Sequence, residues 1–170
     1  MKVVLMMAAT VDGKIGRTSQ EFPDWTGKED KIMFKQATQR AGVVIMGSKT
    51  YDAIGKPLPG RKNVVLTRNK NRLSRHDNLV YSDTKPQQLL KELGREGYTE
   101  VVLAGGSIIN SLFAREDLID EIHITYAPKI FGQGISLFSE AVSMALQLMA
   151  VERLGSDHIL AKFRVLKNGP

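Results

Sequence analysis

The chain has 170 residues, of which 42% are hydrophobic and 25% charged, so we expect a globular fold in a single domain over residues 1–170. It contains no cysteine, which excludes disulfides, thiolate metal sites and cysteine nucleophiles. No apolar run approaches the roughly 20 residues that span a bilayer. The apolar start Met1–Met7 is too short for a signal peptide, because Asp12 and Lys14 follow it. We therefore expect a cytoplasmic protein that does not contact membranes.

The formal net charge of +6 raises the question of a nucleic-acid partner. The basic residues are interspersed with acidic ones, and aromatic residues make up only 6% of the chain, so we expect no stacking platform for bases. A basic surface also attracts anionic small molecules and speeds their binding. We therefore predict a small-molecule substrate and no nucleic acid.

Strand-like apolar runs recur along the chain, and helical patterns separate most of them. The strand-like runs are Val3–Ala9, Val43–Met46, Asn63–Thr67, Leu79–Ser82, Glu100–Ala104 and Glu121–Ala127. The helical patterns are Lys28–Arg40, Pro86–Leu93 and Ser107–Phe113. This alternation predicts βαβ units and a parallel sheet that is covered on both faces. Only Gly155-Ser156-Asp157 separates the last two runs, Met144–Leu154 and His158–Val165, which predicts an antiparallel hairpin.

The segment Val44–Asn69 concentrates basic residues at the ends of two predicted strands. Gly47 ends the first strand, and the residues after it can open a short helix whose unpaired N–H groups suit an anion. The turn Pro57–Gly60 presents Arg61, and Arg68 follows the second strand. These positions predict a site for a ligand with two anionic ends. An ordinary strand–helix–strand unit with a solvated basic turn is the alternative interpretation.

An aspartate lies on the inward face of the first predicted helix. The sequence Thr26-Gly27-Lys28-Glu29 has the form of a capping box, which predicts a helix start at Thr26. On this helix Asp30 shares a face with Phe34 and Ala37, which should point inward. An ionised carboxylate there requires a hydrogen-bonding partner. The alternative is a first-turn acid that only complements the helix dipole.

Nearly the whole chain resembles dihydrofolate reductase. The matching segments are MMAATVDGKIG near the start, Trp25 with Asp30 and Phe34, GSKTYDAIGKPLPGR, LAGGS and IHITYA. The resemblance implies a three-layer α/β fold: a mostly parallel eight-stranded sheet with an antiparallel C-terminal hairpin and helices on both faces. The reductase of riboflavin biosynthesis shares this fold and often carries a DGKI-like opening and a segment like Ala127–Gly132.

The resemblance implies roles for residues on the substrate side. Asp30 would hold the 2-amino group and N3 of a pterin, and Thr125 would hydrogen-bond the Asp30 carboxylate. Trp25 would be a catalytic residue together with these two. Such an acid fixes the ring and favours the protonated pterin, which is the better hydride acceptor. Arg61 would clamp the α-carboxylate of the substrate's glutamate with its planar fork. The remaining implied substrate contacts are Met6, Phe34 and Ile54.

On the cofactor side the resemblance implies NADPH. Ala8 and Ile15 would offer backbone contacts to the nicotinamide amide, and Lys49 and Arg68 would hold the 2′-phosphate, which favours NADPH over NADH. In the family the glycine pair after the strand Glu100–Ala104 is joined by a cis peptide. The remaining implied contacts are Gly16, Gly47, Thr50, Thr67, Gly105, Gly106, Ser107 and Ile108. Asn110 and Lys31 stand where the family usually has a tyrosine and a bulky apolar residue.

We therefore predict NADPH-dependent reduction of 7,8-dihydrofolate to tetrahydrofolate, a step of one-carbon metabolism. The alternatives are a riboflavin-pathway reductase of a ribosylamino-pyrimidinone 5′-phosphate and a non-enzymatic nucleotide-binding module. His123 and His158 have no metal-ligand spacing, so we predict no metal. A monomer and a homodimer are both compatible with the sequence.

Overall fold

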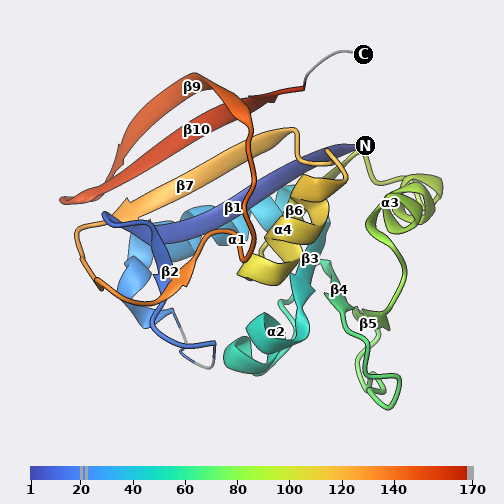
Figure 1. Ribbon diagram of the computed structural model, residues 1–170. Coiled ribbons are helices and arrows are strands. Elements are labelled where there is room, and N and C mark those ends of the chain that lie inside the picture. The colour runs from blue at the N-terminus through green and yellow to red at the C-terminus, as the bar shows by residue number, and fades with distance from the viewer. Residues whose placement is uncertain (20, 22, 168–170) are drawn as a thin grey trace.

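The computed structural model describes residues 1–19, 21 and 23–167 and is built around one eight-stranded sheet (Figure 1). Its strands are β1 (Lys2–Thr10), β3 (Val43–Gly47), β4 (Lys62–Leu66), β5 (Leu79–Ser82), β6 (Glu100–Leu103), β7 (Glu121–Ala127), β9 (Ala145–Leu154) and β10 (His158–Leu166). The helices are α1 (Lys28–Ala41), α2 (Ser48–Ile54), α3 (Pro86–Arg95) and α4 (Ser107–Arg115), with a short 3₁₀ helix η1 (Asp24–Thr26). A separate small sheet pairs β2 (Lys14–Gly16) with β8 (Ile135–Ser136).

The strand order is β5-β4-β3-β6-β1-β7-β10-β9. The pairs from β5 through β7 are parallel, whereas β10 is antiparallel to β7 and β9 is antiparallel to β10. The predicted mostly parallel sheet with an antiparallel C-terminal hairpin is confirmed. Because β1, β3, β4 and β6 are parallel, their carboxyl ends meet at one edge, which is where open α/β sheets bind ligands.

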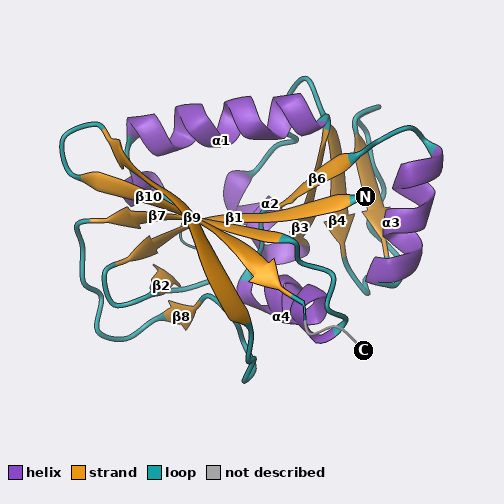
Figure 2. Cartoon of the chain, turned by 90° about the horizontal axis from the view of Figure 1, so that it is seen from above, coloured by secondary structure: helices purple, strands orange, loops and turns teal. Residues whose placement is uncertain are grey.

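Helices cover both faces of the sheet, as predicted (Figure 2). Val43 and Ile45 of β3 pack into the core on the side of α3 and α4, whereas Val44 and Met46 pack on the side of α1 and α2. Successive side chains of a strand point to opposite faces, so a strand buried on both sides must be apolar throughout. This is why the central strands read as continuous apolar runs.

Two details differ from the sequence prediction. The capping box is wrong: α1 begins at Lys28, Gly27 precedes it with φ 86°, and no side chain caps the helix. The Thr26 hydroxyl instead donates to the carbonyl of Pro23, at 3.4 Å, inside η1. The β2–β8 sheet was not predicted, because strands of three and two residues are too short to show an alternation of apolar and polar side chains.

Among the described helices, none has the length and apolar composition that crossing a bilayer requires.

Candidate active site

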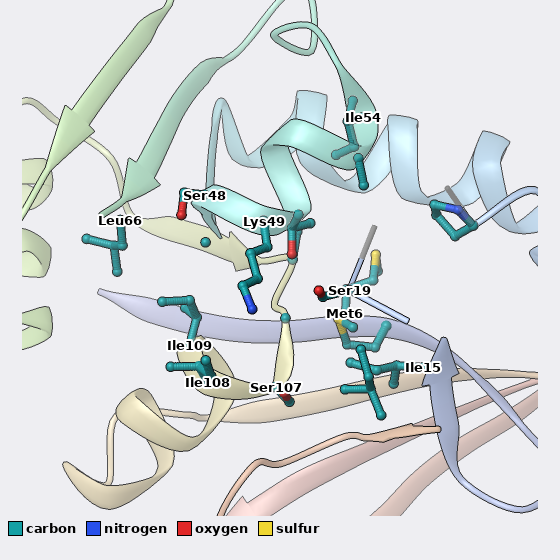
Figure 3. Close-up of a pocket in the computed structure, with 18 of the residues that line it drawn as sticks. Met6, Ile15, Ser19, Ser48, Lys49, Ile54, Leu66, Ser107, Ile108 and Ile109 are labelled. Atoms are coloured by element: carbon teal, nitrogen blue, oxygen red, sulfur yellow. The ribbon is translucent and has the colours of Figure 1, made fainter. Parts of the chain in front are cut away.

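A cleft of about 1230 Å³ opens at the carboxyl ends of the parallel strands. The face of α1, the α2 segment and the start of α4 form its walls, and the loop before η1 lies at its rim. A pocket for one small molecule has about 300–1000 Å³, so this cleft is larger than a typical single-ligand pocket. Figure 3 shows Lys49 of α2 pointing into it, between Met6 and Ile15 on one side and Ile108 and Ile109 on the other.

Most of the predicted site residues come together in this cleft. Its lining contains Met6, Ala8, Ile15, Trp25, Asp30, Phe34, Gly47, Lys49, Thr50, Ile54, Arg61, Thr67, Arg68, Gly106, Ser107 and Ile108. Three predicted residues, Gly16, Gly105 and Thr125, are not part of the lining. Of these, Thr125 lies behind the cleft on β7, where it pairs in register with Ala8 of β1.

Asp30 lines the cleft and is only 9% exposed. Burial raises the pKa of its carboxyl above the ordinary aspartate value, while the nearby hydroxyls of Thr125 and Thr26 and the charges of His158 and Lys31 act in the opposite direction. Thr125 Oγ1 meets no acceptor with full hydrogen-bond geometry in the described residues, so we infer proximity between this hydroxyl and the carboxylate rather than a complete bond. Asp30 is thus a buried acceptor that favours a ligand with N–H donors.

Trp25 is held in place by an aromatic side chain that the sequence did not identify. The ring of Phe131, in the loop after β7, meets Trp25 edge-on with centroids 5.2 Å apart, and the Arg17 guanidinium lies 4.0 Å from the Phe131 ring centroid. The indole Nε1 is buried without a hydrogen-bond partner in the described part of the chain. Because Trp25 also lines the cleft, a ligand there would meet an indole that Phe131 holds in place.

Asp12 ties the β1–β2 turn to the same loop. Its carboxylate accepts hydrogen bonds from the Thr10 hydroxyl at 2.6 Å and from the backbone N–H groups of Phe131 and Gly132 at 3.1 and 2.8 Å. The Thr10 hydrogen bond is the largest cause of a lowered Asp12 pKa. This link holds the Phe131 loop beside the turn that leads into β2, whose Ile15 lines the cleft.

The cleft extends from Asp30 along an apolar wall to a basic rim. Phe34 of α1, Ile54 of α2 and Leu58 after it form the wall, and they pack against the core on this side of the sheet. Lys35 and Lys56 are exposed at the rim. The wall would accommodate a flat apolar group, and the rim suits a carboxylate or a phosphate.

Arg61 also lines the cleft, but it is only 6% exposed and its guanidinium is already bonded within the protein. Nε and Nη2 donate to the carbonyl of Pro59 at 3.0 and 2.8 Å, while Nη1 donates to the carbonyl of Lys35 at 3.3 Å and to the Thr38 hydroxyl. A guanidinium has five N–H donors, so these bonds leave one for a ligand. The predicted two-bond clamp on a carboxylate would require Arg61 to exchange one of these internal bonds.

Asn63 organises this turn and was missed by the sequence reasoning. It is fully buried, its amide donates to the carbonyls of Leu58, Arg61 and Asn78, and its oxygen accepts the N–H of Leu58 at 2.9 Å. The available signal was an asparagine inside the strand-like run Asn63–Thr67, where this residue type is disfavoured.

In the other half of the cleft, the end of β3 lies close to the glycine pair that follows β6. The N–H of Gly47 donates to the Gly105 carbonyl at 2.7 Å, and the Gly105–Gly106 peptide is cis, as the resemblance implied. α4 begins at Ser107, where the first helical turn offers unpaired N–H groups and a partial positive charge. Together with Lys49 and Arg68, these groups fit a ligand that carries phosphates.

Asn110 is buried in α4 outside the cleft lining, and its amide donates to the Leu137 carbonyl at 2.7 Å. It therefore anchors the segment after β8. Within residues 1–19, 21 and 23–167, no three His, Asp or Glu side chains gather in a group that could hold a metal ion.

Comparisons with solved structures define the class of this fold. The RibD protein of Acinetobacter baumannii superimposes with a TM-score of 0.83 at 20% identity, over 98% of this chain and 58% of that one. A dihydrofolate reductase from Enterococcus faecalis, complexed with NADP(H) and RAB-propyl, superimposes with a TM-score of 0.71 at 19% identity, over 98% and 97% of the two chains. At these identities the likeness shows the fold alone, which this chain shares with both proteins.

Sequence comparison places the chain within the dihydrofolate reductase superfamily. A family model for the RibD C-terminal domain matches residues 1–160, so the chain belongs to that family. A dihydrofolate reductase of Haemophilus influenzae is 34% identical over 106 residues, which cover 62% of this chain and 61% of that relative. The resemblance to the superfamily is confirmed, and the family model points to the riboflavin-type branch at least as strongly as to dihydrofolate reductase itself.

Proposed function

We propose that this chain is an NADPH-dependent reductase that transfers a hydride to the pterin ring of 7,8-dihydrofolate, giving tetrahydrofolate for one-carbon metabolism. The observation that carries the proposal is the buried Asp30 carboxylate in the cleft, beside the hydroxyls of Thr26 and Thr125. A carboxylate in this position can accept two parallel hydrogen bonds from the N–H edge of an aminopyrimidine.

Such a pair does two things for the reaction. It fixes the orientation of the ring, which is the main requirement for transfer between two bound molecules. It also favours the protonated form of the ring, because a buried carboxylate is stabilised by a positive charge next to it. The raised pKa of Asp30 supports this role. It shows that burial disfavours the charged carboxylate, which a ligand with N–H donors or a proton would stabilise.

The shape of the cleft beyond Asp30 favours a folate. Phe34, Ile54 and Leu58 offer an apolar wall for the aromatic middle of the molecule. Lys35 and Arg61 also line the cleft and could contact the glutamate carboxylates. The one N–H that Arg61 has left suits a single bond to a carboxylate oxygen, and Lys35 adds charge beside it.

The other half of the cleft fits a nicotinamide dinucleotide phosphate. A Cβ added at Gly47 would lie 2.9 Å from Ile109 Cγ1, so a glycine at this position lets α4 approach the end of β3 closely. The first turn of α4 and Lys49 would hold the phosphates, and Arg68 the 2′-phosphate. When bound, the cofactor supplies the hydride.

A riboflavin-pathway reductase is the second candidate, and the family model over residues 1–160 favours it. A ribosylamino-pyrimidinone 5′-phosphate also has an N–H edge for Asp30. Its phosphate could bind at the basic rim formed by Lys35 and Lys56. The apolar wall between these points would then have no aromatic group to contact, which is why we place dihydrofolate first.

Oxidation of NADPH, followed by its absorbance with dihydrofolate and separately with the pyrimidine phosphate, tests the proposal. We expect rapid oxidation with dihydrofolate and slow or no oxidation with the pyrimidine phosphate. The reverse result would assign the chain to the riboflavin pathway. Cofactor binding without oxidation of either substrate would indicate a nucleotide-binding module.

We expect Arg68→Ala to weaken NADPH binding by about one to a few kcal/mol, the usual contribution of a charge-assisted hydrogen bond. The affinity for NADH should hardly change, because NADH lacks the 2′-phosphate. Titration calorimetry with both cofactors measures the difference. Lys70→Ala is the matched control, since Lys70 lies outside the cleft, 3.9 Å from Asp83. Equal losses for the two cofactors would show that Arg68 does not recognise the 2′-phosphate.

A further inference from the structure

An ion pair joins the loop after β4 to helix α2. The guanidinium of Arg72 donates two hydrogen bonds to the carboxylate of Asp52, from Nη1 to Oδ1 at 2.7 Å and from Nη2 to Oδ2 at 2.6 Å. Asp52 belongs to α2, whereas Arg72 lies in the loop between β4 and β5. Neither residue lines the cleft. The Asp52–Arg72 pair can therefore act on a ligand only through the two segments that it joins.

The pair is stronger than an isolated ion pair on a surface, which contributes little because water screens its charges. Two parallel bonds are the arrangement in which a guanidinium binds a carboxylate best. The Arg72 guanidinium also lies over the ring of Tyr81 of β5, 5.6 Å from its centroid, and this ring meets that of Tyr51 of α2 edge-on at 5.8 Å. The hydrogen bonds from Arg72 hold the pKa of Asp52 below its ordinary value. Charge and ring contacts thus join the loop to the helix at one place.

A short hydrogen-bonded segment connects Arg72 to Arg68. The Thr67 hydroxyl accepts the N–H of Asn69 at 3.1 Å, and the Asn69 side-chain oxygen accepts the N–H of Asn71 at 3.0 Å. The Asn69 carbonyl accepts the N–H of Arg72 at 3.4 Å. Turns in which a side-chain oxygen accepts an N–H two residues further on restrict the local backbone. Arg68 lies within this segment, so its backbone position depends on where Arg72 is held.

Helix α2, at the other side of the pair, carries Lys49. This side chain points from α2 into the cleft (Figure 3), and Asp52 follows it in the same helix. A helix is rigid over one turn, so the pair fixes the position of Lys49 relative to that of Arg68. Like charges repel. Two cations that bind the phosphates of one ligand therefore have to be held together by contacts elsewhere.

We propose that Asp52 and Arg72 are positioning residues for recognition of the 2′-phosphate of NADPH, because they hold Arg68 and Lys49 in the relative positions from which both bind one cofactor. This inference rests on the proposed function, in which Lys49 holds the phosphates and Arg68 the 2′-phosphate. NADH has no group for Arg68 to bind. The selectivity between the two cofactors then depends on two residues outside the cleft.

Asp52→Asn tests the proposal, because positioning and long-range charge predict opposite results for it. Asparagine removes a negative charge from the helix that carries Lys49, so an effect of charge alone would make NADPH bind more tightly. Loss of the positioning bonds should instead raise the dissociation constant for NADPH about three- to fivefold, the upper end of what an exposed ion pair contributes. The dissociation constant for NADH should hardly change. Titration calorimetry measures both, and circular dichroism checks the fold.

Two further variants test whether the effect depends on geometry and passes through Arg68. Arg72→Lys keeps the charge but cannot form two parallel bonds, so it should lose NADPH affinity as Asp52→Asn does. Arg75→Gln is the control, since Arg75 is exposed in the same loop and lies outside the cleft lining. In the Arg68→Ala background, adding Asp52→Asn should change the dissociation constant for NADPH by less than about twofold, because the positioned residue is gone.

Each outcome separates the pair from the proposed function. Unchanged or tighter NADPH binding in Asp52→Asn would overturn the inference, and so would equal losses for NADPH and NADH. The same holds for an undiminished loss in the Arg68→Ala background. In all three cases a wild-type protein that prefers NADPH would leave the proposed cofactor in place. Equal affinity of the wild type for NADPH and NADH would overturn the 2′-phosphate assignment itself, and this inference with it.

Discussion

At neutral pH, Asp30→Asn is expected to slow the reduction of dihydrofolate by about 10²- to 10⁴-fold, the range of a positioned proton-transfer group. Asparagine keeps the shape of the side chain but removes the charge that favours the protonated ring. Turnover should recover as the pH is lowered, where the substrate protonates without help. The affinity for NADPH should stay nearly unchanged, because Lys49 and Arg68 lie in the other half of the cleft.

Glu29→Gln is the matched control for this variant. Glu29 precedes Asp30 in the first turn of α1 and also complements the helix dipole, but it is exposed and lies outside the cleft. Its substitution should leave turnover at the wild-type rate. If Asp30→Asn also retained wild-type turnover across the pH range, Asp30 would be only a dipole-complementing acid and the assignment to substrate would be wrong.

The stability of Asp30→Asn gives a second test. The variant should lose turnover but gain stability. Burial raises the pKa of Asp30, so the native state binds its proton more tightly than the unfolded state does. The unfolding free energy that depends on Asp30 therefore falls as the pH rises from the ordinary carboxyl range through the native pKa. Asp30→Asn removes this penalty, and we expect a higher melting temperature than wild type at neutral pH. The difference should shrink on acidification, and a variant less stable than wild type at neutral pH would contradict it.

The parts of the fold that were predicted correctly are those that local periodicity defines. The runs Leu79–Ser82 and Glu121–Ala127 match β5 and β7 residue for residue. In β7 the buried Ile122 and Ile124 alternate with less buried residues, a pattern typical of a strand. The C-terminal hairpin followed from the three turn residues Gly155–Asp157. By contrast, Thr26 has the residue type of a helix cap, but the positive φ of Gly27 and the contact with Asp30 direct it elsewhere.

The site residues were predicted because their types and spacing match those of a known family. The features that could not be predicted are contacts between segments far apart in the sequence. Phe131 reaches Trp25 across more than a hundred residues of sequence, and no local pattern indicates that contact. The internal bonds of Arg61 to Lys35 and Thr38 belong to the same class. They change the chemistry that the residue offers, from a two-bond clamp to a single remaining donor. Sequence therefore placed Arg61 in the cleft but could not show how many of its N–H groups are free.

Gly47→Ala is expected to weaken NADPH binding by at least tenfold while leaving the backbone of β3 unstrained. Gly47 has φ −81°, which alanine adopts freely, so the effect is purely steric. The new Cβ would lie 2.9 Å from Ile109 Cγ1, which is next to the branch point of that side chain and cannot swing away as a chain end would. Overpacking of this kind costs about 1–3 kcal/mol. The movement that relieves it separates β3 from α4, where the phosphates are proposed to bind.

A second substitution tests this steric cause. In the background of Ile109→Ala, which removes the clashing carbon, adding Gly47→Ala should change the dissociation constant for NADPH by less than about threefold, since the two residues then no longer overlap. Gly94→Ala in α3 is the control for the same chemical change: its Cβ would lie 3.7 Å from Met1 Cε, an ordinary contact, and cofactor binding should not respond. If Gly47→Ala weakened NADPH binding as strongly in the Ile109→Ala background as in wild type, the lost affinity would come from the glycine's own contact with the cofactor rather than from the approach of α4.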